Sequence, residues 1–428
     1  MRSANVLVCT EMDFDANLAT TTYESGPCPS DEFPRTAEPV CLLGTMYSTL
    51  HDMEELKDDI RSRIWCTYRR NFPAIGSSGQ TCDTGWGCML RCGQMMLAQT
   101  LVLKHLGKDW RWRSGSGSKN YWRLLRMFQD KKACVFSIHQ IASMGESEGK
   151  AVGQWFGPNT IAQVLKRIVG YDEWSSLAIH VALDNAVIEQ EIRELCGKCG
   201  NKEQSSATVN GDGRQVGAQK FSRFVNDPIP KASKSERPPE GQAESQGHWQ
   251  SLLLIIPLRL GLTDINPIYF EALKKCLSLP HSVGIIGGKP NHAHWFIGYV
   301  GDELVYLDPH TSQPACDLDD PEERSAGDES YHCRFPSRMN MSRLDPSIAV
   351  GFFCDTEKDF DDLCKSLRAF AERNKDMMFE ICKDRPPHLQ YNFDTVKPTL
   401  RKSGGAAAAA RMSDASGSSV DEEEFEII

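Results

Sequence analysis

Apolar residues recur at helical spacing along much of the first half of the chain. Leu56, Ile60 and Ile64 stand four residues apart and predict a helix over 53–69. Residues 88–104 are apolar on nearly every side of their later turns, which indicates a helix that is buried all round. The same spacing, with start signals such as Gly-Pro-Asn-Thr before residue 161, predicts further helices over 121–128, 161–168, 184–196 and 357–373.

Short apolar runs of strand length dominate the second half of the chain. They predict strands over 252–258, 283–286, 295–300 and 303–307, followed by another apolar run over 346–353. Gly301 and Asp302 lie between two of these runs and favour a hairpin turn. A helical first half and a β-rich second half are typical of an α+β fold.

Polar and low-complexity stretches divide the chain into one folded domain and flexible segments. We expect a flexible N-terminal tail over 1–33, one folded domain over 34–395 and a flexible C-terminal tail over 396–428. Residues of about 197–247 are rich in Gly, Ser, Asn, Lys, Glu and Pro. They bury too little apolar surface to offset their ordering entropy, so we expect a disordered insertion there.

Charge and cysteine usage narrow the class of protein. The net charge of −10 over 428 residues argues against a nucleic-acid partner or direct binding to an anionic membrane. The N-terminal residues lack the apolar core of a signal peptide, and no run approaches the length of a membrane span. The sixteen cysteines are scattered over a long chain, so we expect reduced thiols and a cytoplasmic protein.

One cysteine, Cys88, has the setting of a nucleophile. It follows a Gly-Trp-Gly turn at the start of a predicted helix, with Asp83 and Thr84 as candidate capping residues. A cysteine reacts as its thiolate, and the unpaired N–H groups of a helix N-terminus favour that negative charge. The N–H of Cys88 itself would also be free to donate to an oxyanion.

A histidine partner is suggested near the end of a predicted strand. Asp308 and His310 are two residues apart, so in an extended segment they project on one face and the carboxylate can orient the imidazole. The alternative is that Asp308-Pro309-His310 is an ordinary turn. Because Cys88 and His310 are far apart along the chain, spacing alone does not show that they meet.

Eight motifs, in order, give the chain a family resemblance. From about Phe33 to Lys383 the chain resembles the autophagins, cysteine proteases that process ubiquitin-like autophagy modifiers. The matching stretches are 65–73, 83–95, 138–141, 153–160, 257–264, 287–291, 306–311 and 344–353.

The resemblance implies a papain-like fold with a small auxiliary α/β insertion and disordered tails. Cys88 would be the nucleophile, His310 the general base and acid, and Asp308 the orienting carboxylate. Tyr68 falls on the family's oxyanion tyrosine; without the resemblance it would be a core tyrosine on an amphipathic helix.

A gate over a narrow cleft is also implied. Trp155 and the loop containing Gly287, Gly288 and Pro290 fall where family members have such a gate. A flat indole beside two glycines would suit a tunnel that admits a glycine-ended peptide. On its own, Trp155 is more often a core residue.

The implied substrates are ubiquitin-like modifiers cut after a C-terminal glycine. The leaving group would be a peptide tail in a precursor or the amine of phosphatidylethanolamine in a conjugate. The enzyme would therefore touch membranes transiently, through the conjugated substrate, and would need no cofactor.

The last residues of the chain carry a second candidate motif. Phe425 and Ile428 have the acid-aromatic-x-x-aliphatic spacing of a peptide that adds a strand to a modifier's sheet edge. This motif leaves open a different function, a catalytically silent scaffold that only binds modifiers.

Other cysteines and histidines gave weaker hypotheses. Cys92 lies one helical turn after Cys88 and is either a redox partner or a buried bystander thiol. Cys196 and Cys199 form a lone CxxC, which is a weak metal or disulfide signal. His292 and His294 suggest a metallohydrolase only as an outsider, and we expect no metal site.

Overall fold

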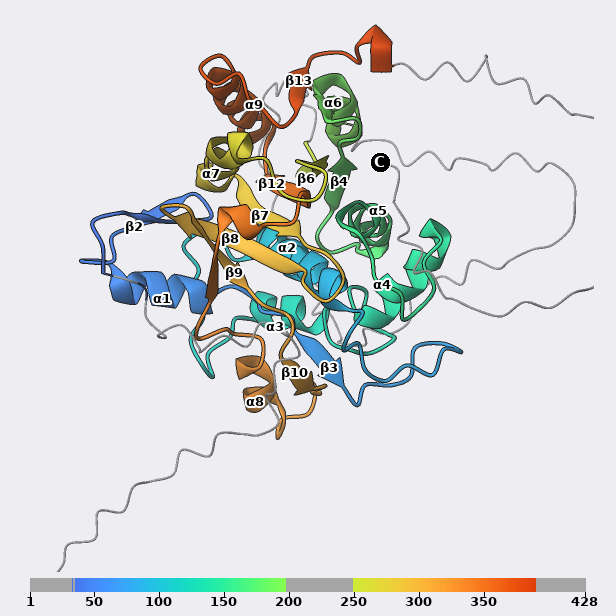
Figure 1. Cartoon of the computed structure of the whole chain (residues 1–428). Coiled ribbons are helices and arrows are strands. Elements are labelled where there is room, and N and C mark those ends of the chain that lie inside the picture. The colour runs from blue at the N-terminus through green and yellow to red at the C-terminus, as the bar shows by residue number, and fades with distance from the viewer. Residues whose placement is uncertain (1–32, 34, 198–248, 390–428) are drawn as a thin grey trace, which may run out of the picture.

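The structure is a computed structural model and describes residues 33, 35–197 and 249–389. A mixed sheet of nine strands lies at its centre (Figure 1). Along the main path the strands are β11 (Ser337–Asn340), β9 (Glu303–Leu307), β8 (His294–Val300), β7 (Ser282–Gly287), β12 (Ser347–Cys354), β6 (Ser251–Arg259) and β4 (Leu177–Val181). β1 (Val40–Leu42) pairs with β8 and with β2 (Thr45–Tyr47). Only β4 runs parallel to its neighbour in this sheet, within the described residues.

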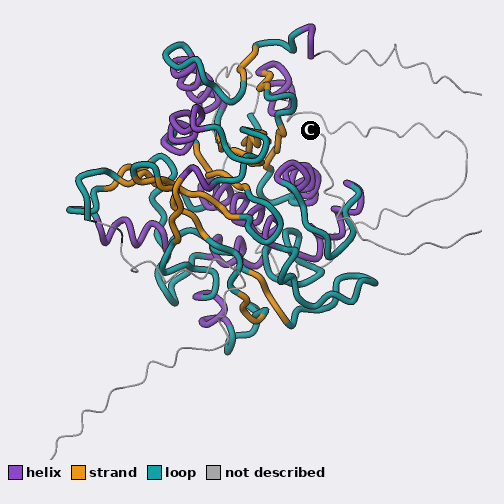
Figure 2. Tube along the Cα trace, viewed as in Figure 1, coloured by secondary structure: helices purple, strands orange, loops and turns teal. Residues whose placement is uncertain are grey.

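Helices cover both faces of the sheet (Figure 2). They are α1 (Met53–Arg61), α2 (Cys88–His105), α3 (Lys119–Arg126), α4 (Ile138–Gly145), α5 (Pro158–Ile168), α6 (Glu189–Gly197), α7 (Phe270–Ser278), α8 (Arg324–Glu329) and α9 (Glu357–Ala371). Two small sheets complete the structure: β3 (Tyr68–Arg70) with β10 (Ser312–Pro314), and β5 (Ala186–Ile188) with β13 (Glu380–Cys382). Among the described helices, none has the length and apolar character needed to cross a membrane.

Alternate residues of β6 enter two different cores. Leu253 and Ile255 pack in the core that contains α2 and α5. Leu252 and Leu254 face the opposite core, which contains α7 and α9. Because both faces of the strand are buried, the sequence shows a continuous apolar run rather than an alternating pattern. The strand predictions are therefore confirmed as β6, β7, β8, β9 and β12, and the predicted hairpin joins β8 to β9 with Val300 opposite Glu303.

The predicted helix over 53–69 is wrong beyond Arg61. Ile64 instead bridges to His332, and Tyr68 lies in β3, paired in parallel with Ser312 of β10. The backbone of this segment therefore finds hydrogen-bond partners far along the chain, and these partners outweigh the local helical periodicity. The predicted helix over 184–196 also begins late, at Glu189, because residues 186–188 form β5.

The division into a helical first half and a β-rich second half is only partly right. β1, β2 and β4 come from the first half and join the main sheet, while α7 and α9 come from the second half. The described chain is a mixed helix and sheet protein. Its buried helix α2 contacts β7 and β8 of the central sheet.

Candidate active site

Cys88 is the first residue of α2 and is fully buried. The turn before it needs glycine, because Gly85 has a φ of +89°, in the left-handed region. Gly87 packs so closely on the Asp83 side chain that an added Cβ would overlap it. The thiol lies in the first turn of α2, whose unpaired N–H groups favour its ionised form.

The predicted side-chain cap at this helix is wrong. The N-cap position is Gly87, and among the described residues no side chain caps α2. The Asp83 carboxylate instead accepts hydrogen bonds from the backbone N–H of Arg69 at 2.6 Å and from Nε of Arg91 at 2.7 Å. The backbone carbonyl oxygen of Asp83 accepts a hydrogen bond from the N–H of Gly87 at 2.8 Å.

Asp308 and His310 lie just after β9 and contact each other directly. Nδ1 of His310 is 2.5 Å from Oδ1 of Asp308, and the backbone N–H of His310 donates to the same oxygen at 2.9 Å. The indole N–H of Trp65 donates to the carbonyl oxygen of Asp308 at 2.8 Å. This arrangement fixes the tautomer and orientation of the imidazole, and it leaves Nε2 toward the Cys88 thiol.

Tyr68 also contacts the Cys88 thiol. Its backbone N–H donates to the carbonyl oxygen of Pro309 at 2.8 Å. Its ring meets the His310 ring edge-on, with the ring centroids 5.4 Å apart. The hydroxyl is buried against the Cys88 thiol and the backbone of Gly85, and it has no other partner among the described residues. Burial and the facing thiolate raise the pKa of Tyr68, so the hydroxyl keeps its proton and can donate it.

The thiol and the imidazole stabilise each other's charged forms. Burial opposes ionisation of Cys88, but its hydrogen bond to His310 and the positive charge of that ring lower the pKa of the thiol overall. Burial likewise opposes protonation of His310, yet the hydrogen bonds to Asp308 and Cys88 raise its pKa to about 9. The pair can therefore exist near neutral pH as thiolate and imidazolium, a nucleophile beside a proton donor.

His294 is a buried neighbour of this pair that the sequence singled out only for metal binding. Nε2 of His294 lies 3.9 Å from Oδ1 of Asp308, and burial lowers its pKa to about 4, so the ring is neutral. His294, Asp308 and His310 offer three ligand atoms within 4.8 Å of one another.

The spacing of these three groups fits a hydrogen bond better than a metal. Two ligands of one tetrahedral zinc ion stand roughly 3.3 Å apart, given bonds of about 2.0 Å. The 2.5 Å between Nδ1 of His310 and Oδ1 of Asp308 is much shorter than this and lies nearer the roughly 2.7–2.9 Å of a charge-assisted N–H···O hydrogen bond. His292 instead lies 3.1 Å from the carbonyl oxygen of Pro290, so the pair His292 and His294 does not converge on one point.

The glycine loop between β7 and β8 lies next to the thiol. Gly288 has a φ of +133°, and an added Cβ would overlap the carbonyl oxygen of His292. The backbone of Ala293, at the end of the loop, hydrogen-bonds the Cys88 thiol. An added Cβ on Gly85 would lie 3.9 Å from Oδ1 of Asn291, so the loop also faces the turn before α2.

The other residues of the implied gate occupy different settings. Gly287 is buried at the end of β7, and Pro290 is exposed in the loop. Trp155 is partly buried against the core that contains α2, and its indole N–H has no hydrogen-bond partner among the described residues. A gating role for these residues stays a prediction.

The remaining sequence hypotheses have different outcomes. Cys92 is fully buried, and burial with the nearby Cys88 charge raises the pKa of its thiol well above the ordinary value, which favours the bystander interpretation. Cys196 is a buried free thiol, while its CxxC partner Cys199 lies outside the described residues. Phe425 and Ile428 also lie outside them, as do residues 1–32, 198–248 and 396–428 of the expected flexible segments.

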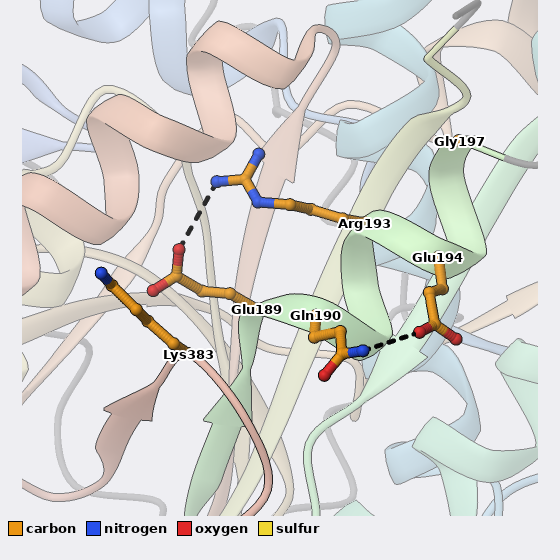
Figure 3. A pocket seen from close by; sticks show the side chains of 6 residues that line it. All are labelled: Glu189, Gln190, Arg193, Glu194, Gly197 and Lys383. Atoms are coloured by element: carbon orange, nitrogen blue, oxygen red, sulfur yellow. Dashed lines mark hydrogen bonds and ion pairs between the residues drawn. The ribbon is translucent and has the colours of Figure 1, made fainter.

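A hollow of about 780 Å³ lies away from these residues, beside α6 (Figure 3). It is lined by Glu189, Gln190, Arg193, Glu194, Gly197 and Lys383. Arg193 is already paired with Glu189 and Glu357, which ties α6 to α9. No described residue of the hollow belongs to the Cys88 site, so we interpret it as a structural feature.

Known proteins match most of the chain. The family description "Peptidase C54 catalytic domain" fits residues 53–366. The chain is 48% identical over 415 residues to cysteine protease ATG4B of Gallus gallus, covering 96% of this chain and 99% of that protein. It is 42% identical over 426 residues to cysteine protease ATG4A of Xenopus laevis, covering 97% and 100%. It is 43% identical over 376 residues to cysteine protease ATG4A of Homo sapiens, covering 87% and 89%.

Proposed function

This chain belongs to the peptidase C54 family and is an autophagy cysteine protease, and we propose that it cleaves ubiquitin-like autophagy modifiers after a C-terminal glycine. The supporting observation is the contact of the Cys88 thiol with His310, whose other ring nitrogen lies 2.5 Å from Asp308. We assign Cys88 as the nucleophile, His310 as the general acid and base, and Asp308 as the orienting carboxylate.

In the first half of the proposed reaction, the Cys88 thiolate attacks the carbonyl carbon of the terminal glycine. The carbonyl π electrons move to oxygen, and this oxyanion accepts hydrogen bonds from the Tyr68 hydroxyl and the N–H of Cys88. When the C–N bond breaks, His310 gives its proton to the leaving amine. The modifier remains on Cys88 as a thioester.

In the second half, the neutral imidazole of His310 takes a proton from water as the water oxygen attacks the thioester carbonyl. The C–S bond breaks, the thiolate is restored, and the modifier leaves with a free glycine carboxylate. Asp308 stabilises the imidazolium formed in this step, because its Oδ1 is already bonded to Nδ1 of His310.

A glycine-ended substrate suits the crowded surroundings of the thiol. Cys88 is fully buried, the backbone of Ala293 at the end of the glycine loop hydrogen-bonds its thiol, and the turn at Gly85 faces Asn291 of the same loop. A glycine has no side chain to place in this space. We propose that this loop and Trp155 form the gate through which the modifier's C-terminus reaches Cys88.

The same acyl group is present in two substrates, the precursor and the phosphatidylethanolamine conjugate. We therefore propose that one site both activates the modifier and removes it from membranes. The enzyme would work in the cytoplasm and touch membranes only through its conjugated substrate. We also propose that residues 34–395 form a papain-like domain, since the nucleophile begins a buried helix that packs on the sheet carrying the histidine loop.

The alternative, a silent scaffold, would bind modifiers through Phe425 and Ile428 alone. It gives no reason for a buried thiol whose pKa is lowered by His310 beside an oriented carboxylate. We therefore treat the C-terminal motif as a proposed docking segment that adds to the protease function.

Cleavage of a purified modifier precursor by wild type, Cys88→Ala and Cys92→Ala tests the proposal. We expect Cys88→Ala to lose at least about 10³-fold in kcat, because the nucleophile is gone. Cys92→Ala, on the same helix, should cleave within about threefold of wild type, since its thiol takes no part in the reaction. Cleavage by Cys88→Ala would overturn the proposal.

A further inference from the structure

A buried cluster of ion pairs lies at the first turn of α2, the helix that begins with the proposed nucleophile Cys88. Arg91, one turn into α2, is paired with Asp83 at 2.7 Å through Nε and with Asp130 at 2.8 Å through Nη1. All three side chains are almost completely buried. A buried charge cluster of this kind is a weak contributor to stability by itself.

Asp83 contacts two backbone segments that support the proposed site: the strand that carries Tyr68 and the turn before Cys88. Asp83 accepts from the N–H of Arg69 at 2.6 Å, and Arg69 is the residue after Tyr68. The backbone of Asp83 holds the last turn before Cys88, because its carbonyl oxygen accepts from Gly87 at 2.8 Å. Asp83 thus lies between the strand of the proposed oxyanion donor and the helix of the proposed nucleophile.

The opposite edge of the same strand is tied to the histidine loop. The N–H of Tyr68 donates to Pro309 at 2.8 Å, and Tyr68 is paired in register with Ser312. β3 therefore runs between the turn that precedes α2 and the segment that carries His310. Asp83 therefore joins β3, which carries Tyr68, to the turn that leads into Cys88.

We propose that Asp83 is a positioning residue that fixes the Tyr68 hydroxyl relative to the Cys88 thiol through the Arg69 backbone and the Gly87 turn. This inference rests on the proposed function, because it gives Tyr68 the role of oxyanion donor. Asp83 touches no substrate and is not itself catalytic. Its charge matters because Arg91 holds the second carboxylate oxygen and so prevents the side chain from rotating away from Arg69.

The chain offers a matched control in Asp130. Asp83→Asn and Asp130→Asn each remove one carboxylate from Arg91, and each places an amide N–H₂ or a weaker acceptor beside a guanidinium. Both variants should lose stability by similar amounts. Only Asp83→Asn also changes the side-chain acceptor of the Arg69 N–H, while the backbone bond from Gly87 to residue 83 is kept in both variants.

The test measures kcat, KM and melting temperature for both variants, with and without Tyr68→Phe. We expect Asp83→Asn to lower kcat by 10- to 100-fold with KM changed less than about threefold, and Asp130→Asn to keep kcat within about threefold. In the Tyr68→Phe background, Asp83→Asn should cost less than about threefold more, because the donor that it positions is already absent.

Two outcomes would overturn the positioning role. One is an equal loss of kcat in Asp83→Asn and Asp130→Asn that follows their melting temperatures. The other is a fold-loss of kcat in the double variant that equals the product of the losses in Asp83→Asn and Tyr68→Phe. The pH dependence of Cys88 alkylation by iodoacetamide is measured as a control, because it needs no modifier substrate. If wild type is alkylated at low pH but does not cleave the modifier, the proposed substrate is wrong and the positioning of the thiol is not in question.

Discussion

The N–H of Tyr68 donates to the carbonyl oxygen of Pro309 at 2.8 Å, across 241 residues of sequence. This hydrogen bond joins β3 to the loop between Asp308 and His310. Both the Tyr68 phenol and the His310 imidazole contact the Cys88 thiol, and the two rings meet edge-on with their centroids 5.4 Å apart. The proposed oxyanion donor and the proposed acid and base are therefore parts of one hydrogen-bonded unit.

Tyr68→Phe should keep this unit folded and remove only the hydroxyl. The ring contact with His310 and the backbone bond to Pro309 do not need the phenol oxygen. We expect kcat to fall by about 10²-fold with little change in KM, as for loss of one oxyanion donor. Steady-state kinetics on a modifier precursor would check this, and an unchanged kcat would remove Tyr68 from the proposed mechanism.

The pH dependence of Cys88 alkylation should reveal its partner. Because His310 lowers the pKa of the thiol, we expect wild type to react with iodoacetamide well below the ordinary thiol pKa of about 8.5. In His310→Gln the reaction should rise only near that ordinary value. Identical profiles for the two proteins would contradict the thiolate–imidazolium pair.

Peptide cleavage should also decline at high pH. The pKa of His310 is raised to about 9, so the ring is protonated below this pH and loses its proton as pH rises through it. Above it, no proton remains for the leaving amine, and kcat for an amide substrate should fall. A rate that stays constant to pH 10 would argue against His310 as the general acid.

Gly288→Ala should damage the loop beside the thiol. A Cβ there would overlap the carbonyl oxygen of His292, and the φ of +133° is unsuited to a side chain. Gly107→Ala is a matched control, since Gly107 also has positive φ, +87°, but an added Cβ meets nothing within 4 Å. We expect about 1 kcal/mol of destabilisation for the control, and about 2 to 4 kcal/mol with a fall in kcat/KM for Gly288→Ala.

Denaturant unfolding and cleavage kinetics of both glycine variants measure these effects. Equal destabilisation, with kcat/KM unchanged in both, would show that the loop geometry at Gly288 is not needed for activity. It would also remove one support for the proposed gate.

Chelation and thiol alkylation should have opposite effects. The 2.5 Å contact between Asp308 and His310 fits a hydrogen bond, so we expect a chelator to leave cleavage unchanged. One equivalent of iodoacetamide per Cys88 should abolish it. Loss of cleavage with the chelator, together with resistance to iodoacetamide, would revive a metal-based mechanism at His294.

Local sequence patterns predicted the parts of the site that depend on local structure. Cys88 at a helix start and Asp308 beside His310 follow from a glycine turn, a strand end and the alternation of an extended segment. The strands β6, β7, β8 and β9 were also predictable, because burial on both faces leaves apolar runs of strand length.

Contacts between distant segments could not be predicted in this way. The helical spacing of Leu56, Ile60 and Ile64 predicts a helix that includes Tyr68, whereas the backbone of Tyr68 pairs with β10, far along the chain. The position of Asp83 before a helix predicts a capping residue, whereas its carboxylate accepts hydrogen bonds from the Arg69 backbone and the Arg91 side chain. Nothing in the sequence around His294 indicates that it lies next to Asp308.

Covalent trapping tests the central claim most directly. A ubiquitin-like autophagy modifier whose C-terminal glycine carries an electrophile is incubated with wild type, Cys88→Ala and His310→Ala, and the adduct is mapped by mass spectrometry. We expect one modifier per chain on Cys88, no adduct in Cys88→Ala and slower labelling in His310→Ala. An adduct on a different cysteine, or binding without any adduct in wild type, would contradict the assignment of Cys88 as the nucleophile.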